Sequence, residues 1–206
     1  MKKALLLLPV SLCLLLFSFS AQAISSQATQ LKDKLAVFEQ MHAQFVQRVL
    51  SSEGKLLNES SGEMTISRPG KFHWQVETPE EELIVSDGKT IWYYSPFIEQ
   101  VTLINFADAI NDTPFALIAG ADEKQWENYI VKQQGNKFTV TNPTQVQPTT
   151  FIFEFDNKNN INKFIVIEEQ GQRSEFTLTH QAMPNDFSDA LFDFQIPENV
   201  EVDDQR

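Results

Sequence analysis

The sequence predicts a mainly β protein with a few helices (α+β), built on one large antiparallel sheet. Apolar side chains recur at every second position in several segments, which is the spacing of a strand with one buried face. Turn residues separate these segments at short intervals, without the longer helical stretches that βαβ units require. We therefore expect about ten or eleven short strands in a single sheet.

One amphipathic helix is expected before the strands begin, over residues Ser26 to His42. Apolar residues recur there at spacings of three, four and three, at Ala28, Leu31, Leu35 and Phe38. This spacing places them on one face of a helix, with charged residues between them.

The period then changes to two, and three sets of apolar residues each share one strand face: Phe72, Trp74 and Val76; Phe151, Phe153 and Phe155; Phe176 and Leu178. Hairpin turns are predicted at Asp87-Gly88, at Gly135-Asn136 and around Gly171. The segment from Asp156 to Asn162 faintly resembles a calcium loop. Lys158 stands where an oxygen ligand is needed, so we interpret it as a turn.

Between Val101 and Trp126 the strand pattern breaks and helix signals replace it. Thr113 can cap a helix, Pro114 suits its first turn, and Gly120 suits the position after its end. The body, residues 115–119, is apolar on all sides. Such a short helix must be covered on several sides or must itself cover an apolar surface.

The N-terminal region has the three parts of a secretory signal peptide: Lys2 and Lys3, an apolar run from Ala4 to Phe19, and the cleavage-site residues Ala21-Gln22-Ala23. Cleavage would remove residues 1–23 and leave residues 24–206 as a single domain. That mature chain would contain no cysteine, so a packed core rather than disulfides must hold it together.

The chain is strongly acidic. Loss of Lys2 and Lys3 from the 16 basic residues would leave 14 against 28 acidic ones, a formal charge of −14. This charge disfavours nucleic acid, whose binding depends on Lys and Arg, and disfavours stable insertion into anionic membranes. We favour the simpler interpretation that the acidity only keeps the protein soluble.

Motifs for catalysis or metal binding are absent from the sequence, which contains no G-x-S-x-G, no H-E-x-x-H and no phosphate-binding glycine loop. We interpret His42, His73 and His180 as ordinary polar residues. No catalytic residue, metal site or cofactor is expected. Carboxylates brought together by the fold remain an open route to an enzyme.

The aromatic content is the more informative feature, because fifteen of the seventeen phenylalanines lie beyond the signal region. A sheet of this size, curled into a barrel, would enclose space for a ligand. An ordinary core closed by the first helix is the alternative, and both stay open. Arg68 is either a surface charge or a donor to the free carbonyls at the end of the residue 114–119 helix.

The motifs R-P-G-K-F-H-W from Arg68, V-S-D-G-K-T-I-W from Val85 and T-P-F-A-L-I from Thr113 resemble the LolA family of periplasmic outer-membrane lipoprotein carriers. The resemblance runs in order through nearly the whole mature chain. Gly70 and Ser95 depart from it, since the family commonly has Asn at both positions. Both replacements suit turns, so the assignment stands.

This resemblance implies an unclosed antiparallel β-barrel of about 11 strands, covered by an N-terminal helix and short lid helices. The barrel would enclose a hydrophobic cavity for lipoprotein acyl chains, lined by the Phe72/Trp74/Val76 face and the Trp92 or Tyr93 side of a later strand. It assigns lid locking to Arg68 and contact with a release complex to Phe72. Cavity or lid roles fall to Leu35, Trp74, Phe115, Leu117 and Ile118.

The implied activity is carriage rather than catalysis. The protein would act as a periplasmic monomer that receives acylated lipoproteins from an inner-membrane ABC-type lipoprotein-releasing complex and passes them to an outer-membrane receptor lipoprotein. A secreted hydrolase or isomerase of small apolar molecules on a lipocalin-like barrel is the main alternative. A structural or adhesion protein and an outer-membrane barrel come after it.

Overall fold

The computed structural model describes residues 26–109, 117–118, 120, 126–143, 148–183 and 187–206. Its strands form one twelve-stranded sheet in the order β12-β6-β5-β4-β3-β2-β1-β11-β10-β9-β8-β7. The strands are β1 (Gln40–Leu50), β2 (Leu56–Ser67), β3 (Lys71–Thr78), β4 (Glu82–Asp87), β5 (Thr90–Ser95), β6 (Gln100–Asn105), β7 (Ile130–Gln134), β8 (Lys137–Thr141), β9 (Thr150–Phe155), β10 (Ile161–Ile167), β11 (Arg173–Ala182) and β12 (Glu201–Asp204).

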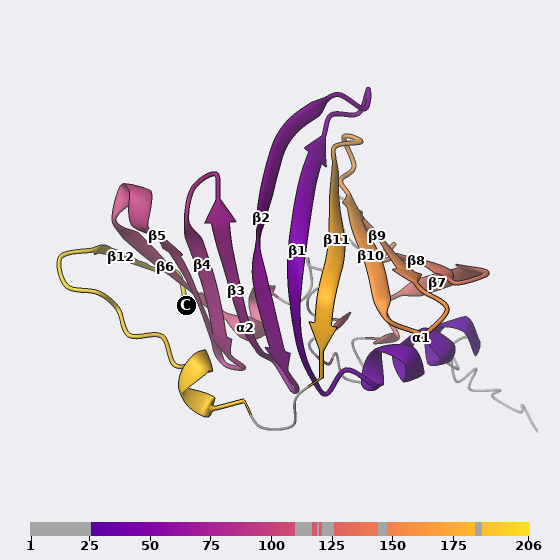
Figure 1. Ribbon diagram of the computed structural model, residues 1–206, viewed down its shortest axis with the longest axis horizontal. Helices are drawn as coiled ribbons and strands as arrows, with labels where there is room; N and C mark the ends of the chain where they lie inside the picture. The colour runs from indigo at the N-terminus through magenta and orange to yellow at the C-terminus, as the bar shows by residue number, and fades with distance from the viewer. Residues whose placement is uncertain (1–25, 110–116, 119, 121–125, 144–147, 184–186) are drawn as a thin grey trace, which may run out of the picture.

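The sheet is strongly curved but not closed, because its two outer strands, β12 and β7, do not pair with each other. The long β1–β2 hairpin stands at the centre of the curve (Figure 1). Helical elements with described bounds are α1 (Ser26–Ala36), α2 (Phe106–Ala109) and the 3-10 helices η1 (Pro96–Ile98) and η3 (Asp189–Phe192). The mainly β class, the unclosed sheet and the N-terminal helix are thus confirmed.

The predicted hairpin turns lie where the sequence places them. The Asp87-Gly88 turn joins β4 to β5, and the Asp87 Oδ1 atom accepts hydrogen bonds from the backbone N–H of Lys89 and of Thr90 at 2.7 and 2.8 Å. Gly88 has a φ of +90°, which a residue with a side chain rarely adopts. The Gly135 and Gly171 turns likewise connect β7 to β8 and β10 to β11.

The N-terminal helix is shorter than predicted. It ends at Ala36, and strand β1 begins at Gln40, so the expected continuation to His42 is wrong. Met41, Ala43 and Phe45 are buried at alternate positions, which is the period of a strand. Phe38 fits the helical spacing and is also fully buried, but it lies in the connection between the two elements.

The expected break of the strand pattern at Val101 also comes too early. Residues 100–105 form β6, which pairs with β5 and buries Val101 and Leu103 at alternate positions. The chain leaves the sheet only at Phe106, where α2 begins. Val101 and Leu103 alone form too short an alternating pattern to distinguish this strand from the helical segment that follows.

The sheet is not wholly antiparallel, because the C-terminal strand β12 pairs with β6 in parallel. Before it, the chain passes along the outside of the sheet through η3 (Figure 1). An ion pair of 2.6 Å between Lys71 Nζ and Asp189 Oδ1 fastens η3 to β3. Phe194 packs against the rings of Trp92 and Tyr94, with centroids 6.4 and 5.7 Å away. This arm therefore covers the outer face of β3 to β5.

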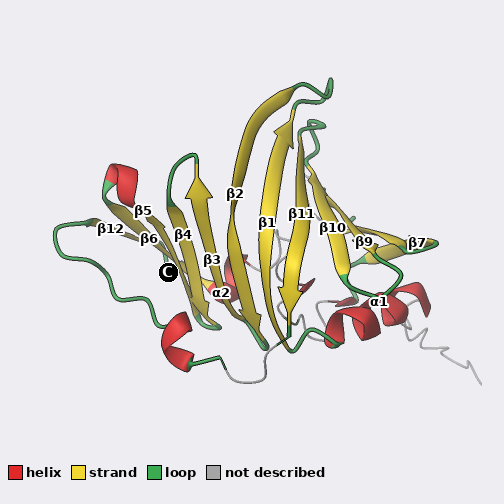
Figure 2. Ribbon diagram, in the orientation of Figure 1, coloured by secondary structure: helices red, strands yellow, loops and turns green. Residues whose placement is uncertain are grey.

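The densest part of the core lies in the other half of the sheet, between β7–β11 and α1. Leu31 and Leu35 of α1 are completely buried, and α1 contacts β7 (Figure 2). Four phenylalanines on β8, β9 and β10 are completely buried as well: Phe138, Phe151, Phe153 and Phe164. This half is a filled core.

Strand β2 contains a glycine that the pairing with β3 requires. A Cβ atom at Gly62 would lie 1.9 Å from the Gln75 carbonyl oxygen, where the register between β2 and β3 shifts. We expect Gly62→Ala to lower the free energy of unfolding by about 3 kcal/mol or more, since backbone rather than a flexible side chain must move. Denaturant unfolding measures this loss.

Gly54→Ala is the control for that variant. Its added Cβ meets no atom within 4 Å, and only its φ of +84° opposes the substitution. The expected cost is about 1 kcal/mol. Equal losses for the two variants would contradict a close backbone approach at Gly62.

Candidate functional site

An apolar cavity of about 440 Å³ lies on the inner face of the other half of the sheet, over β2 to β6. Strands β1 and β11 add one residue each, and α2 adds two. Its apolar lining comprises Met64, Ile66, Phe72, Trp74, Ile84, Ile91, Ile104, Phe106, Ala109 and Phe176, together with Tyr93. We call this the apolar cavity.

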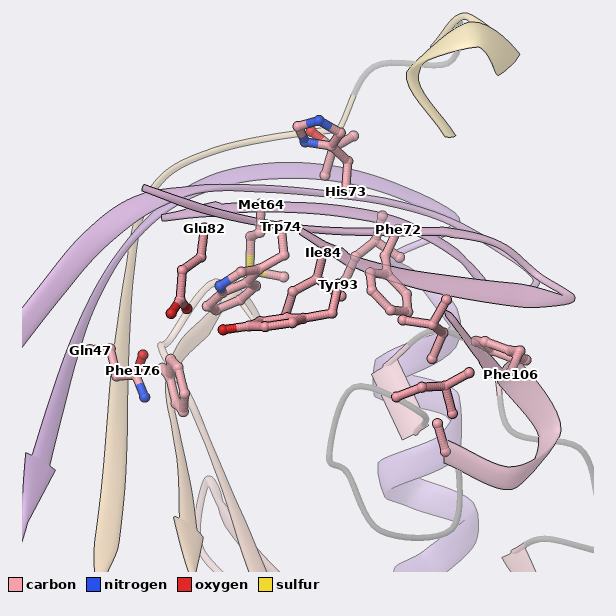
Figure 3. Close-up of a pocket in the computed structure, with 15 residues that line it drawn as sticks. Gln47, Met64, Phe72, His73, Trp74, Glu82, Ile84, Tyr93, Phe106 and Phe176 are labelled. Atoms are coloured by element: carbon pink, nitrogen blue, oxygen red, sulfur yellow. The ribbon is translucent and has the colours of Figure 1, made fainter. Parts of the chain in front are cut away.

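Strand register builds the lining. Trp74 is paired with Ile84 on β4, and Ile84 is paired with Tyr93 on β5. Residues directly opposite one another in an antiparallel sheet point to the same face, so these three side chains form a row across three strands. Figure 3 shows Trp74, Ile84 and Tyr93 side by side beneath the strands. Phe72 begins a second row two residues away, nearer to Phe106.

An aromatic wall separates the apolar cavity from the filled core. The ring of Phe45 stacks on Trp74 with centroids 3.9 Å apart, and Phe176 meets Trp74 edge-on at 5.5 Å. Phe164 of the core stacks on Phe176 with centroids 4.3 Å apart. Such ring contacts add about 0.5–1.5 kcal/mol per pair beyond the burial itself. The wall therefore bounds the apolar cavity on the side of the filled core.

The lining also contains the polar residues Gln47, Thr65, His73 and Glu82, and Glu82 interacts with Tyr93. The Tyr93 hydroxyl donates a hydrogen bond to the Glu82 carboxylate. Burial raises the pKa of Tyr93 to about 12, and this bond and the negative charge of Glu82 add to the shift. Tyr93 is therefore a neutral donor at physiological pH. Glu82 and Gln47 lie toward the Trp74 end of the cavity, away from Phe106 (Figure 3).

Arg68, just after the end of β2, binds the chain far away in sequence. Its Nε donates to the Ile118 carbonyl oxygen at 2.9 Å and its Nη2 donates to the Leu117 carbonyl oxygen at 3.3 Å. Burial lowers the pKa of the Arg68 guanidinium, and the nearby Glu39 carboxylate opposes the shift. Leu117 and Ile118 are helical, and Gly120 has a φ of +108°, as suits the residue after a helix end. We call these two hydrogen bonds the Arg68 latch.

The structure separates the residues singled out in the sequence into three places. Phe72 and Trp74 line the apolar cavity. Leu35, Leu117 and Ile118 are fully or almost fully buried in the hydrophobic core and do not belong to its lining. Phe115, Thr113 and Pro114 lie outside the described residues. Of the two aromatic residues left open on β5, Tyr93 faces the cavity and Trp92 faces the C-terminal arm.

Several lining residues escaped the sequence reasoning. Ile84, Ile91 and Ile104 occupy short strands in which single isoleucines alternate with mixed neighbours. In β4 the apolar residues Leu83, Ile84 and Val85 are consecutive, so only the register with Trp74 shows which face Ile84 joins. Phe106 belongs to α2, which the sequence did not separate from β6.

The described residues contain no group of His, Asp and Glu side chains arranged to hold a metal ion. His73 also belongs to the lining of the apolar cavity, but its ring points to the opposite side of β3 from Trp74, as Figure 3 shows. None of the helices in the described part of the chain combines the length and the apolar character that a membrane crossing requires. The site is thus a space for apolar material with a few polar groups at one end.

Comparison with known proteins identifies relatives along the whole chain. The family described as "Outer membrane lipoprotein carrier protein LolA" matches residues 36–195. The outer-membrane lipoprotein carrier protein of Psychromonas ingrahamii is 51% identical over 207 residues, covering 100% of both chains. The protein of the same name from Aeromonas salmonicida is 44% identical, also over 100% of both chains.

Two solved structures share the fold at low sequence identity. A LolA superfamily protein from Nitrosomonas europaea superposes with a TM-score of 0.50 at 10% identity, covering 82% of this chain and 99% of that one. An uncharacterized conserved protein from Thermus thermophilus gives a TM-score of 0.52 at 13% identity, covering 86% and 99%. These two likenesses concern the fold alone.

The apolar cavity can be tested without its natural ligand. Ile84→Glu places a carboxylate in the middle of the lining row, and we expect it to weaken binding of an apolar fluorescent dye at least about tenfold, because an uncompensated charge must be desolvated. Dye titration by fluorescence measures this. Ile98→Glu, at a residue that is 57% exposed, makes the same chemical change outside the cavity and should bind dye normally. Equal dye binding by both variants would contradict ligand access to the cavity.

Proposed function

From the premise that the chain belongs to the LolA family of outer-membrane lipoprotein carriers, we propose that it carries lipoproteins by burying their acyl chains in the apolar cavity. The lipoprotein-carrier role comes from the family. The apolar cavity is the observation that locates acyl-chain binding in this part of the molecule, because it offers an apolar surface on the inside of an unclosed sheet.

Acyl burial supplies ample binding free energy. Each CH₂ group removed from water gains about 0.8 kcal/mol, so a chain of about fifteen carbons would gain on the order of 12 kcal/mol if fully buried. A cavity of about 440 Å³ is within the range of drug-sized ligand sites, roughly 300–1,000 Å³. This volume suits one ligand of that size, so binding of several acyl chains would require the cover of the cavity to move and enlarge it.

The Arg68 latch would oppose that movement and so limit the net affinity. Hydrogen bonds to a charged group contribute about 1.5–3 kcal/mol each. Opening the cover would break the bonds from Arg68 to Leu117 and Ile118, and closing it again would recover them. Reclosure then offsets part of the cost of releasing the acyl chains. In this role Arg68 locks the lid, and Leu35, Trp74, Phe115, Leu117 and Ile118 form the cavity or its cover.

A carrier between two membranes needs a donor and an acceptor. We place the protein in the periplasm after removal of residues 1–23, as a monomer without enzymatic activity. It would receive lipoproteins from the inner-membrane ABC-type releasing complex, with Phe72 in the contact, and deliver them to the outer-membrane receptor lipoprotein. Phe72 is half-buried in the cavity lining, so contact there could be coupled to opening.

A hydrolase or isomerase would need a base or nucleophile that converges with Glu82 on the apolar cavity. The Glu82 carboxylate instead accepts a hydrogen bond from Tyr93, and the ring of His73, the histidine among the described lining residues, points away from Trp74. Nothing in the described lining favours this second function over carriage.

The latch predicts the behaviour of Arg68→Leu. The variant should still take up lipoprotein, but transfer to the receptor should slow by at least about tenfold, because loss of one charged hydrogen bond already removes about 1.5 kcal/mol of the reclosure free energy. Lysine at this position should restore transfer only in part, because it lacks the planar guanidinium. Transfer is measured as the rate at which purified carrier delivers labelled lipoprotein to the receptor.

Arg48→Leu is the matched control. Arg48 forms a surface ion pair with Glu59 at 3.2 Å, and their side chains are 51% and 55% exposed. Such a pair contributes little, so transfer should match that of the unmodified protein. Transfer by Arg68→Leu at the unmodified rate would show that the Arg68 latch does not control release.

A further inference from the structure

A second, polar pocket of about 370 Å³ adjoins the apolar cavity. It is lined by Gln47, Asn58, Ser60, Val76, Pro79, Glu80 and Glu82. Gln47 and Glu82 belong to the linings of both spaces, so the two meet at these side chains. We call this second space the polar pocket.

The polar pocket lies at the opposite end of the strands from the Arg68 latch. On β2, Ile66 pairs with Phe72 near the latch, whereas Ser61 pairs with Thr78 at the far end. Ser60 and Ser67 are seven residues apart, about 23 Å along an extended strand. The apolar cavity spans the interval between the latch and the polar pocket, and Figure 3 shows Phe106 and Glu82 at its two ends.

The polar pocket offers both hydrogen-bond donors and acceptors. The Ser60 hydroxyl donates to Gln47 Oε1 at 3.2 Å, which orients the Gln47 amide with its N–H₂ group as the donor. Glu82 and Glu80 contribute carboxylates, and none of the described residues lining the pocket is Lys, Arg or His. Tyr93 satisfies one acceptor position of Glu82, and an ionised carboxylate has about four. The pocket therefore suits a ligand that carries nitrogen-bound protons.

We propose that the polar pocket binds the polar head of the lipid anchor, namely the glyceryl esters and the α-nitrogen of the N-terminal residue that bears them, while the acyl tails extend through the apolar cavity toward α2 and Arg68. This inference rests on the proposed function and extends it to the orientation of the cargo. It also assigns Glu82 as the main acceptor for the nitrogen-bound protons, with Glu80 as a second carboxylate in the same lining.

The amphipathic chemistry of the anchor supports this orientation. Ester and amide groups that leave water without new partners cost about 1–3 kcal/mol each in proteins. Gln47 and Glu82 are the two residues shared by the described linings of the apolar cavity and the polar pocket. If the acyl tails occupy the apolar cavity, the polar groups of the anchor that follow the tails would lie next to these two side chains. A carboxylate there favours a positively charged ammonium group over a neutral amide.

Two lipopeptides test the assignment. They carry the same two ester-linked acyl chains and the same short peptide, and they differ only in the α-amino group of the first residue, which is either free or acetylated. At pH 6 the free amine is charged, since its ordinary pKa is about 7.7–8.0. The unmodified protein should bind the free-amine lipopeptide about tenfold more tightly, as expected for one charge-assisted hydrogen bond. Displacement of a fluorescent apolar dye gives both dissociation constants.

Glutamine variants locate the preference. Glu82→Gln should reduce the tenfold ratio to about twofold or less, and Glu80→Gln should reduce it by a smaller factor because that residue is exposed. Glu81→Gln is the matched control, since it removes the same charge from an exposed neighbour outside both linings and should keep the full ratio. Glu80→Gln also tests the polar pocket if Glu82→Gln does not fold.

The possible failures are distinct. Equal binding of the two lipopeptides by the unmodified protein would overturn the head-group assignment while leaving the carrier role intact. A ratio preserved in both Glu82→Gln and Glu80→Gln would also overturn it. Failure of both lipopeptides to displace the dye would overturn the proposed function of the cavity itself, and the head-group assignment with it.

Discussion

The constraint that governs this structure is an apolar inner face on a sheet that does not close. A closed barrel would cover that face by its own curvature, whereas here β12 and β7 remain unpaired edges. The face must therefore be kept from water by separate pieces of chain. The helix α1, the short helix α2 and the segment held by Arg68 supply this cover, and each contributes in a different way.

The two halves of the sheet meet this constraint differently. Over β8 to β10 the inner face is filled, because phenylalanines and the leucines of α1 are packed to complete burial. Over β3 to β6 the lining residues Phe72, Ile84, Ile91 and Ile104 are only half-buried, and space remains beside them. The aromatic wall centred on Trp74 stands between the halves. One half therefore provides stability, and the other retains volume for a ligand.

Several polar groups that could orient a ligand lie toward the two ends of the apolar cavity. The Arg68 latch lies toward one end, where a half-buried cation donates to the carbonyls of Leu117 and Ile118. Glu82, Tyr93 and Gln47 mark the other end, where the lining becomes polar. An amphipathic cargo with tails at one end and a polar head at the other matches this division. Burial of acyl chains contributes a large free energy but does not depend on direction. The polar groups at the two ends of the cavity can therefore determine the orientation of the cargo and its release.

The sequence by itself determined the local features, because these depend on neighbours along the chain. The alternation of Phe72 with Trp74, the Asp87-Gly88 turn and the family motifs predicted a mainly β carrier fold. Only the tertiary structure decided that β1 begins at Gln40, that Ile84 joins the Trp74 row, and which carbonyls Arg68 binds. Strand register and latch partners join residues 10 to 50 positions apart, and local periodicity contains no information about which distant faces will meet.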